Sequence, residues 1–102
     1  MEVEITRFAR SQLLEIYSYY KLKASEATAL QITDKILDSI EELGSLRGIG
    51  SIEPNLVHIH GNYKYMVCGN YKIIFRVIGD IVYVTDIFDC RQDPVKIAKR
   101  NT

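Results

Sequence analysis

The sequence predicts a single α+β domain in which two antiparallel helices pack on one face of a mostly antiparallel, four-stranded sheet. Three observations support this: an alternating segment at the N-terminus, two consecutive helical stripes, and a C-terminal half of strand-like segments joined by tight turns. Strands joined by such short turns pair antiparallel, which leaves the helices to cover one face. The 102 residues suffice for one domain, residues 1–102, and not for two.

The N-terminal segment changes from a strand pattern to a helical pattern. Val3 and Ile5 alternate with polar residues, which predicts a short strand. We expect a helix from Arg7 to near Lys23, because apolar residues recur there at the spacing of one helical face. These residues are Ala9, Leu13, Ile16, Tyr17 and Tyr20.

A second helix is expected directly after the first. Ser25 suits the N-cap, Glu26 places a carboxylate in the first turn, and Gly44 suits the end of the helix. The apolar stripe consists of Ala29, Ile32, Ile36, Ile40 and Leu43. The connection between the helices is so short that they form an antiparallel hairpin.

The C-terminal half follows a glycine-rich loop over residues 44–56. Residues 57–60 are either an edge strand or the lead-in to the next strand. The main strands are expected at residues 63–67, 71–77 and 81–89. Pro94 suits the first turn of a short helical tail that runs to Arg100.

The register between the first two of these strands decides where their charged side chains point. A two-residue loop at Gly69 and Asn70 would mix Lys72 and Arg76 with the tyrosines of the preceding strand. A three-residue loop over 68–70 separates apolar from basic residues, so we adopt it. The core face then includes Tyr63, Tyr65, Val67, Tyr71, Ile73, Phe75, Val77, Val82, Val84 and Phe88.

The adopted register predicts a basic face opposite that core face. It carries Lys64, Lys72, Arg76 and Arg91, with Tyr83, Ile87 and Asp89 beside them. Clustered cations with an aromatic neighbour suit a phosphate backbone or an acidic partner, although the same pattern describes the solvated side of an ordinary sheet. Asp86 falls on the core face and needs a partner there.

The composition argues against a metal, a cofactor and a membrane. Cys68 and Cys90 have no histidine at ligand spacing, so we expect reduced thiols and no metal or cofactor. His58 and His60 alternate on one side of a short segment, and we interpret them as surface or hydrogen-bonded residues rather than catalytic ones. The N-terminal residues lack the apolar part of a secretion signal, which predicts a cytoplasmic protein.

Two segments carry a resemblance to a known family. Residues 69–77 read Gly-Asn-Tyr-Lys-Ile-Ile-Phe-Arg-Val, and residues 87–94 read Ile-Phe-Asp-Cys-Arg-Gln-Asp-Pro. Together with the helical hairpin and the glycine-rich loop, they resemble the RelE/ParE toxin superfamily over nearly the whole chain. The resemblance implies the toxin of a type II toxin–antitoxin, or plasmid stabilisation, system that forms a hetero-oligomer with a cognate antitoxin.

The superfamily contains two kinds of toxin, and the resemblance allows both. ParE-like members inhibit DNA gyrase, whereas RelE-like members are endoribonucleases that cleave messenger RNA on the ribosome without a metal. Lys64, Lys72 and Arg91 match the basic catalytic positions of the RelE-like members. Met66 replaces a further lysine, and no tyrosine or histidine follows Arg91 at the usual acid–base position.

These departures and the zero net charge, from 13 basic and 13 acidic residues, favour gyrase inhibition. Tyr83 replaces the missing acid–base group only if its side chain lies on the same face of the sheet as the basic residues. The expected target- or nucleic-acid-binding residues are Lys64, Lys72, Arg76, Tyr83, Arg91, Lys96, Lys99 and Arg100. A further alternative is an inactive partner-binding module of the same fold.

The antitoxin needs an apolar surface, and four residues lie off the main helical stripes. They are Leu14, Tyr19, Leu30 and Leu37. If these side chains are exposed, they form a docking surface. If they are buried, they belong to a broad apolar stripe of an ordinary core.

Overall fold

A computed structural model describes residues 2–45, 51–56 and 62–100 of the chain. His58, His60 and the segment 57–60 therefore lie outside the described residues. The elements in chain order are β1 (Glu2–Ile5), α1 (Arg7–Lys23), α2 (Glu26–Leu43), β2 (Ser51–Ile52), the 3-10 helix η1 (Pro54–Leu56), β3 (Lys64–Cys68), β4 (Tyr71–Ile78), β5 (Ile81–Asp89) and α3 (Val95–Arg100).

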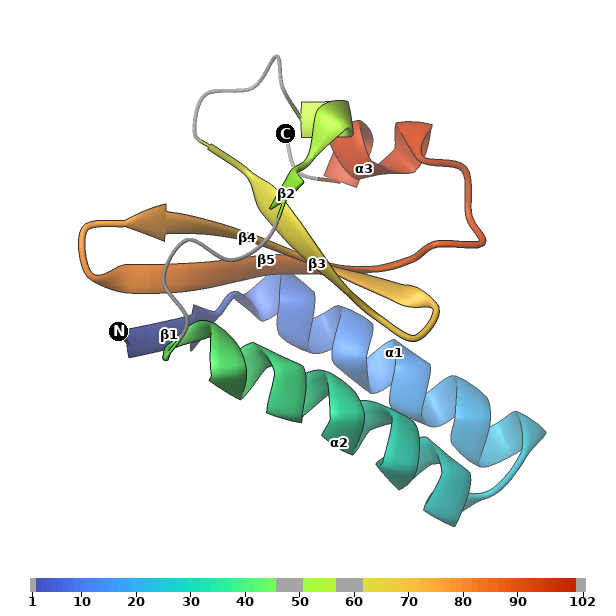
Figure 1. Ribbon diagram of the computed structural model, residues 1–102. Helices are drawn as coiled ribbons and strands as arrows, with labels where there is room; N and C mark the ends of the chain where they lie inside the picture. Colours follow the sequence, from blue (N-terminus) through green and yellow to red (C-terminus); the bar gives the residue numbers. More distant parts are fainter. Residues whose placement is uncertain (1, 46–50, 57–61, 101–102) are drawn as a thin grey trace.

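The strands form one sheet with the order β1-β5-β4-β3-β2. β1 is parallel to β5, and the other pairs are antiparallel. The hairpin of α1 and α2 covers one face of this sheet, while η1 and α3 lie on the other (Figure 1). The predicted α+β architecture is confirmed, and the sheet gains the two-residue β2 inside the segment that was expected to be a loop.

The two helices begin where their capping residues predict. The Thr6 hydroxyl accepts a hydrogen bond from the Ala9 amide at 3.2 Å, and the Ser25 hydroxyl accepts one from the Thr28 amide at 3.1 Å. α2 ends before Gly44 as expected, although Gly44 keeps a right-handed helical conformation. Local sequence signals thus set the bounds of the hairpin.

The turn between β3 and β4 corrects the predicted register. Cys68 pairs directly with Tyr71, so the loop consists of Gly69 and Asn70 alone. Gly69 has a φ of 60°, a value that side-chain-bearing residues rarely adopt and that a type II′ hairpin turn requires at its first position. The three-residue loop was wrong, and every side chain of β3 therefore points to the face opposite the predicted one.

A β-bulge between β4 and β5 produces the second correction. Arg76 pairs with Tyr83 as predicted, and Phe75 pairs with Val84, but the preceding Ile74 pairs with Asp86. Thr85 is therefore an extra residue, and the alternation of β5 reverses there. Ile87 and Asp89 face the helices instead of the predicted basic face, and Phe88 leaves the predicted core face.

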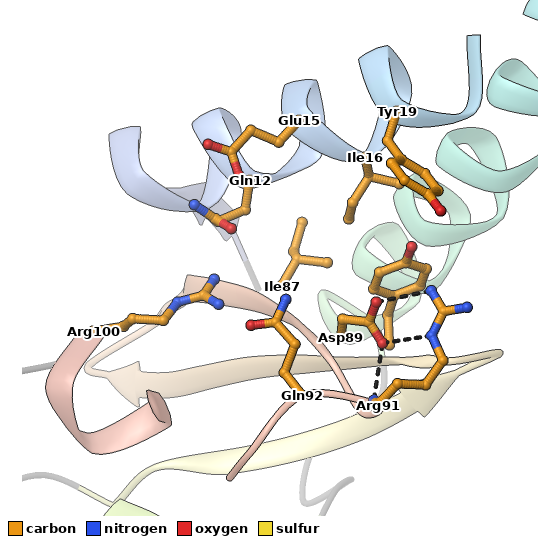
Figure 2. A pocket seen from close by; sticks show the side chains of 10 residues that line it. Gln12, Glu15, Ile16, Tyr19, Ile87, Asp89, Arg91, Gln92 and Arg100 are labelled. Carbon is orange, nitrogen blue, oxygen red and sulfur yellow. Dashed lines mark hydrogen bonds and ion pairs between the residues drawn. The ribbon is translucent and has the colours of Figure 1, made fainter. Parts of the chain in front are cut away.

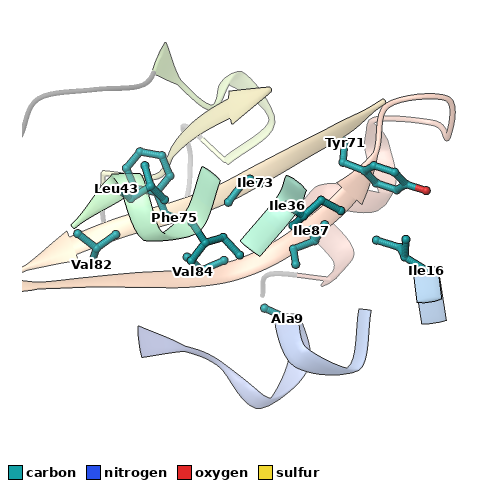
Figure 3. Packing of buried hydrophobic residues seen from close by; sticks show 11 residues of the cluster. Ala9, Ile16, Ile36, Leu43, Tyr71, Ile73, Phe75, Val82, Val84 and Ile87 are labelled. Atoms are coloured by element: carbon teal, nitrogen blue, oxygen red, sulfur yellow. The ribbon is translucent and has the colours of Figure 1, made fainter. Parts of the chain in front are cut away.

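Both faces of the sheet consequently carry a core. The larger core lies between the sheet and the helical hairpin (Figure 3) and contains Ala9, Ile16, Ile36, Ile40, Leu43, Tyr71, Ile73, Phe75, Val82, Val84 and Ile87. A smaller core on the opposite side contains Leu56, Tyr63, Ile74, Phe88 and Ile97. This smaller core attaches η1 and α3 to the second face of the sheet.

Candidate functional site

The predicted basic face does not exist as a single surface. Lys64 pairs with Phe75 and so lies on the side of the sheet that faces the helices. Lys72 and Arg76 alternate with Phe75 along β4 and lie on the second face. Arg91 follows Asp89 at the end of β5 and contacts α1 through Tyr20. The two register corrections explain why the four predicted cations separate.

Lys72 is neutralised by a carboxylate in the second face. Its Nζ lies 3.1 Å from Oε2 of Glu53, whose side chain is fully buried, and 4.4 Å from the ring centre of Tyr65. Glu53 also accepts hydrogen bonds from the backbone and the side chain of Asn55. The ion pair attaches the segment before η1 to the sheet, so the charge of Lys72 is already satisfied within the fold.

Arg91 is held by a two-point ion pair. Its Nε and Nη2 donate to the two carboxylate oxygens of Asp89 at 2.9 and 2.8 Å, and Nη2 lies 3.4 Å from the hydroxyl of Tyr20. The guanidinium holds the pKa of Asp89 below its ordinary value. Hydrogen bonds from Tyr71 and then from Arg91 lower the pKa of Tyr20, whereas burial raises that of Tyr71.

Arg100 anchors the last turn of α3. Its Nη2 lies 2.6 Å from the fully buried Oδ1 of Asp86, and its guanidinium lies about 5 Å from the ring centres of Phe8 and Phe88. Asp86 thus has the partner that the sequence required, although on the second face. Lys96 and Lys99 of the same helix are exposed.

Arg76 occupies a different environment on the second face. Its guanidinium lies 5.2 Å from the ring centre of Tyr63, and its Nη1 donates to the Tyr63 hydroxyl at 3.4 Å. The half-buried Tyr83 lies directly across on β5. Tyr83 therefore faces the same way as Arg76 and Lys72, and away from Arg91.

A cavity of about 400 Å³ lies between α1 and the segment that connects β5 to α3 (Figure 2). Tyr71 and Ile87 line it along the sheet, with Gln12, Glu15, Ile16 and Tyr19 on the side of α1. Arg91, Gln92 and Arg100 lie on the other side, and both arginines are already paired with carboxylates. The cavity suits contact with a protein segment better than capture of a polyanion.

Other chemistry finds little support in the described part of the chain. No group of three or more histidine, cysteine or acidic residues there could hold a metal ion, and Cys68 and Cys90 are free thiols. None of the described helices is long and apolar enough to cross a membrane.

The helical hairpin exposes apolar side chains, as one reading of the sequence predicted. Leu14, Tyr19, Leu30 and Leu37 are 66, 55, 45 and 39% exposed. Leu22 near the end of α1 is also exposed, and the sequence analysis did not single it out. We call these five exposed residues of the two helices the hairpin surface.

Sequence reasoning missed the residues that neutralise the cations. Glu53 stands in an apparently irregular loop, and Tyr20 belongs to an ordinary apolar stripe. Only Asp86 gave a signal, because a carboxylate inside a buried strand requires a partner. The geometry of the described residues therefore defines a small α+β protein whose predicted cations lie on two faces of the sheet and do not converge on one centre.

Comparisons with known proteins agree with this class. The family model described as the ParE toxin of the type II toxin–antitoxin system parDE matches residues 3–94, and the chain belongs to this family. It is therefore the toxin component of a type II toxin–antitoxin system, and its partner is an antitoxin.

A solved structure, the chromosomal ParDE toxin–antitoxin system from P. aeruginosa, is similar with a TM-score of 0.75. The two chains share 22% identity, over 87% of this chain and 95% of that one, which supports the fold. Among curated proteins the comparison finds no match.

Proposed function

We propose that this toxin arrests growth by inhibiting DNA gyrase through protein contacts, and not by cleaving RNA. One observation carries the proposal beyond the family: the cations that a nuclease would use are separated, and two of the three are paired with carboxylates. Lys72 is paired with buried Glu53, Arg91 is paired with Asp89, and Lys64 lies on the opposite face from Lys72.

The chemistry of RNA cleavage explains why this arrangement matters. A metal-independent nuclease stabilises the charged phosphoryl transition state with cations that point at one place and whose N–H groups are available. It also needs an acid–base group beside them. Cations that already bind carboxylates on two faces of a sheet do not meet the first condition. Contact with a protein target requires neither condition.

The test compares the two targets directly with purified toxin. We expect loss of gyrase supercoiling and accumulation of cleaved DNA at a molar excess of toxin, and no cleavage of messenger RNA on purified ribosomes. The toxin mixed with its antitoxin is the control and should leave gyrase active. Unchanged supercoiling and DNA cleavage at high excess of toxin would exclude the proposal.

One observation supports the ribonuclease as a second candidate. The hydroxyl of Tyr20 lies 3.4 Å from Arg91, and its lowered pKa brings it closer to the range of a general base. If ribosome-dependent cleavage occurs, Tyr20→Phe should abolish it while the toxin remains folded. An inactive partner-binding module, the third candidate, predicts harmless overexpression of a folded protein that still binds antitoxin.

For the antitoxin, we propose that a segment docks on the hairpin surface. Five exposed apolar side chains on two adjacent helices suit the apolar face of a partner helix or extended segment. A gyrase target agrees with a cytoplasmic location, which we propose for the toxin.

A further inference from the structure

Arg76 is a partly buried cation for which the described chain supplies no anion. Its Nε is inaccessible to solvent and has no hydrogen-bond acceptor among the described residues. None of the three ion pairs of the described chain includes it. Its polar contact is the long hydrogen bond to the Tyr63 hydroxyl.

The other two cations on the second face, Lys72 and Arg100, each have a carboxylate partner. Lys72, Arg91 and Arg100 each lie within 3.1 Å of a carboxylate oxygen. Removing a cation from water without an anion lowers stability, and the face of an aromatic ring offsets only part of that loss. An anion from a partner would supply the contact that the described residues do not give to the Nε of Arg76.

The surroundings of Arg76 resemble the centre of a protein interface. Arg76 pairs with Tyr83, and the next pair on the same face is Ile78 with Ile81. Ile78 is 50% exposed, whereas Ile74 and Phe88 further along the face are buried beneath η1 and α3. We call Arg76, Ile78, Ile81 and Tyr83 the open patch. Arginine and tyrosine are among the residues most enriched at the few interface positions that contribute most of the binding free energy.

The edge of the open patch selects the kind of partner. Glu2 pairs with Ile81 and Glu4 with Tyr83, so both glutamates lie on the same face along the edge strand β1, and both are exposed. Two carboxylates beside the patch repel a polyphosphate chain, which carries many charges, more strongly than a single carboxylate that approaches Arg76 beside the ring of Tyr63. The occupant that fits is therefore an acidic side chain of a protein.

We propose that the open patch is the surface through which the toxin binds gyrase, and that an aspartate or glutamate of gyrase forms an ion pair with Arg76. This inference rests on the proposed function, because gyrase is the target named there. It assigns antitoxin and target to different surfaces, the hairpin surface and the open patch, on opposite sides of the sheet (Figure 1).

The test replaces Arg76 with an uncharged side chain of similar length. Arg76→Met should leave the melting temperature unchanged or raise it, because it removes a partly buried charge that has no carboxylate partner among the described residues. The same variant should weaken inhibition of purified gyrase about 30-fold or more, the loss typical of removing one partner of an interfacial ion pair. Binding to the antitoxin should not change.

Two further variants complete the design. Arg7→Met is the matched control, because Arg7 is exposed at the start of α1 on the other side of the sheet, and it should inhibit gyrase like the unmodified toxin. Ile78→Asp changes an exposed residue of the open patch and should weaken inhibition by repelling the incoming carboxylate. It tests the same surface even if Arg76→Met folds poorly.

The outcomes separate the two proposals. If unmodified toxin leaves gyrase unaffected, the proposed function fails, and this inference fails with it. If unmodified toxin inhibits gyrase and both patch variants inhibit equally well, only the inference fails. A clear fall in melting temperature for Arg76→Met with full inhibition by Ile78→Asp would assign Arg76 a structural role and overturn it. If the patch variants lose antitoxin binding but still inhibit gyrase, the open patch binds the antitoxin and the inference is wrong.

Discussion

The second face of the sheet has two halves, which differ in whether their cations are paired with a carboxylate of the described chain. In the half beneath η1 and α3, Lys72 and Arg100 bind the fully buried carboxylates of Glu53 and Asp86. In the open half, Arg76 rests on Tyr63 without a carboxylate from the described chain. The difference indicates that a cation alone says little about function. For Arg76, we infer that the missing internal carboxylate leaves its guanidinium available to a partner.

Replacing Arg100 is the strongest test of this difference between the two halves. Arg100→Met leaves the buried carboxylate of Asp86 without its cation, and we expect the free energy of unfolding to fall by about 3–5 kcal/mol. Urea denaturation at neutral pH measures this loss. Lys96→Met on the exposed side of the same helix is the control and should change little. A loss for Arg100→Met as small as that of the control would show that the two halves do not differ.

Lys72 provides the second test of the covered half. We expect Lys72→Met to lower the free energy of unfolding by about 2–3 kcal/mol, less than Arg100→Met, because Glu53 keeps its two hydrogen bonds from Asn55. The double variant with Glu53→Gln should recover most of the loss, since it removes the orphaned charge. Thermal or urea unfolding of the three variants gives the coupling energy. A stable Lys72→Met variant that loses toxicity would instead indicate a role in the target site.

The fold could be predicted because its signals are local. Thr6 and Ser25 cap the two helices, and the apolar stripes of the hairpin face the sheet. Gly79 and Asp80 form the predicted two-residue turn between β4 and β5, and Gly79 has the positive φ that such a turn requires. These features depend on residues close in sequence, where propensity and spacing are informative.

The site could not be predicted because it depends on register. The three-residue loop was chosen to put all apolar residues on one face, but the sheet is buried on both faces, which removes that criterion. The bulge at Thr85 then exchanges the faces of Phe88 and Asp89. Gly69 and Asn70 are a local signal for the two-residue turn that was set aside, whereas the bulge at Thr85 has no such signal. The register and the bulge are set by the docking of α3 and η1 on the second face, where Ile97 and Leu56 pack against Phe88.

The third test separates the hairpin surface from the open patch. Leu14→Ser combined with Leu30→Ser removes two exposed apolar side chains, so we expect about tenfold or more weaker binding to the antitoxin. Gyrase inhibition by the free variant should not change. Val95→Ser, at a similarly exposed apolar residue that begins α3, is the matched control for antitoxin binding. Loss of gyrase inhibition in the double leucine variant would place the target on the hairpin surface and contradict the division.

The smallest effect is expected at the exposed ion pair of Asp89 and Arg91. Arg91 lowers the pKa of Asp89 in the folded state, so the pair stabilises the fold above the ordinary pKa of an aspartate, near 4. This contribution is lost as the pH falls through the lowered pKa. The difference in unfolding free energy between the protein and Arg91→Gln should therefore be small at pH 7, because exposed pairs contribute little, and should vanish at lower pH. An NMR titration of the Asp89 carboxyl measures the pKa directly. An ordinary pKa in the unmodified protein would show that Arg91 is free of Asp89 in solution, and Arg91 would then join Arg76 as a cation available to a partner.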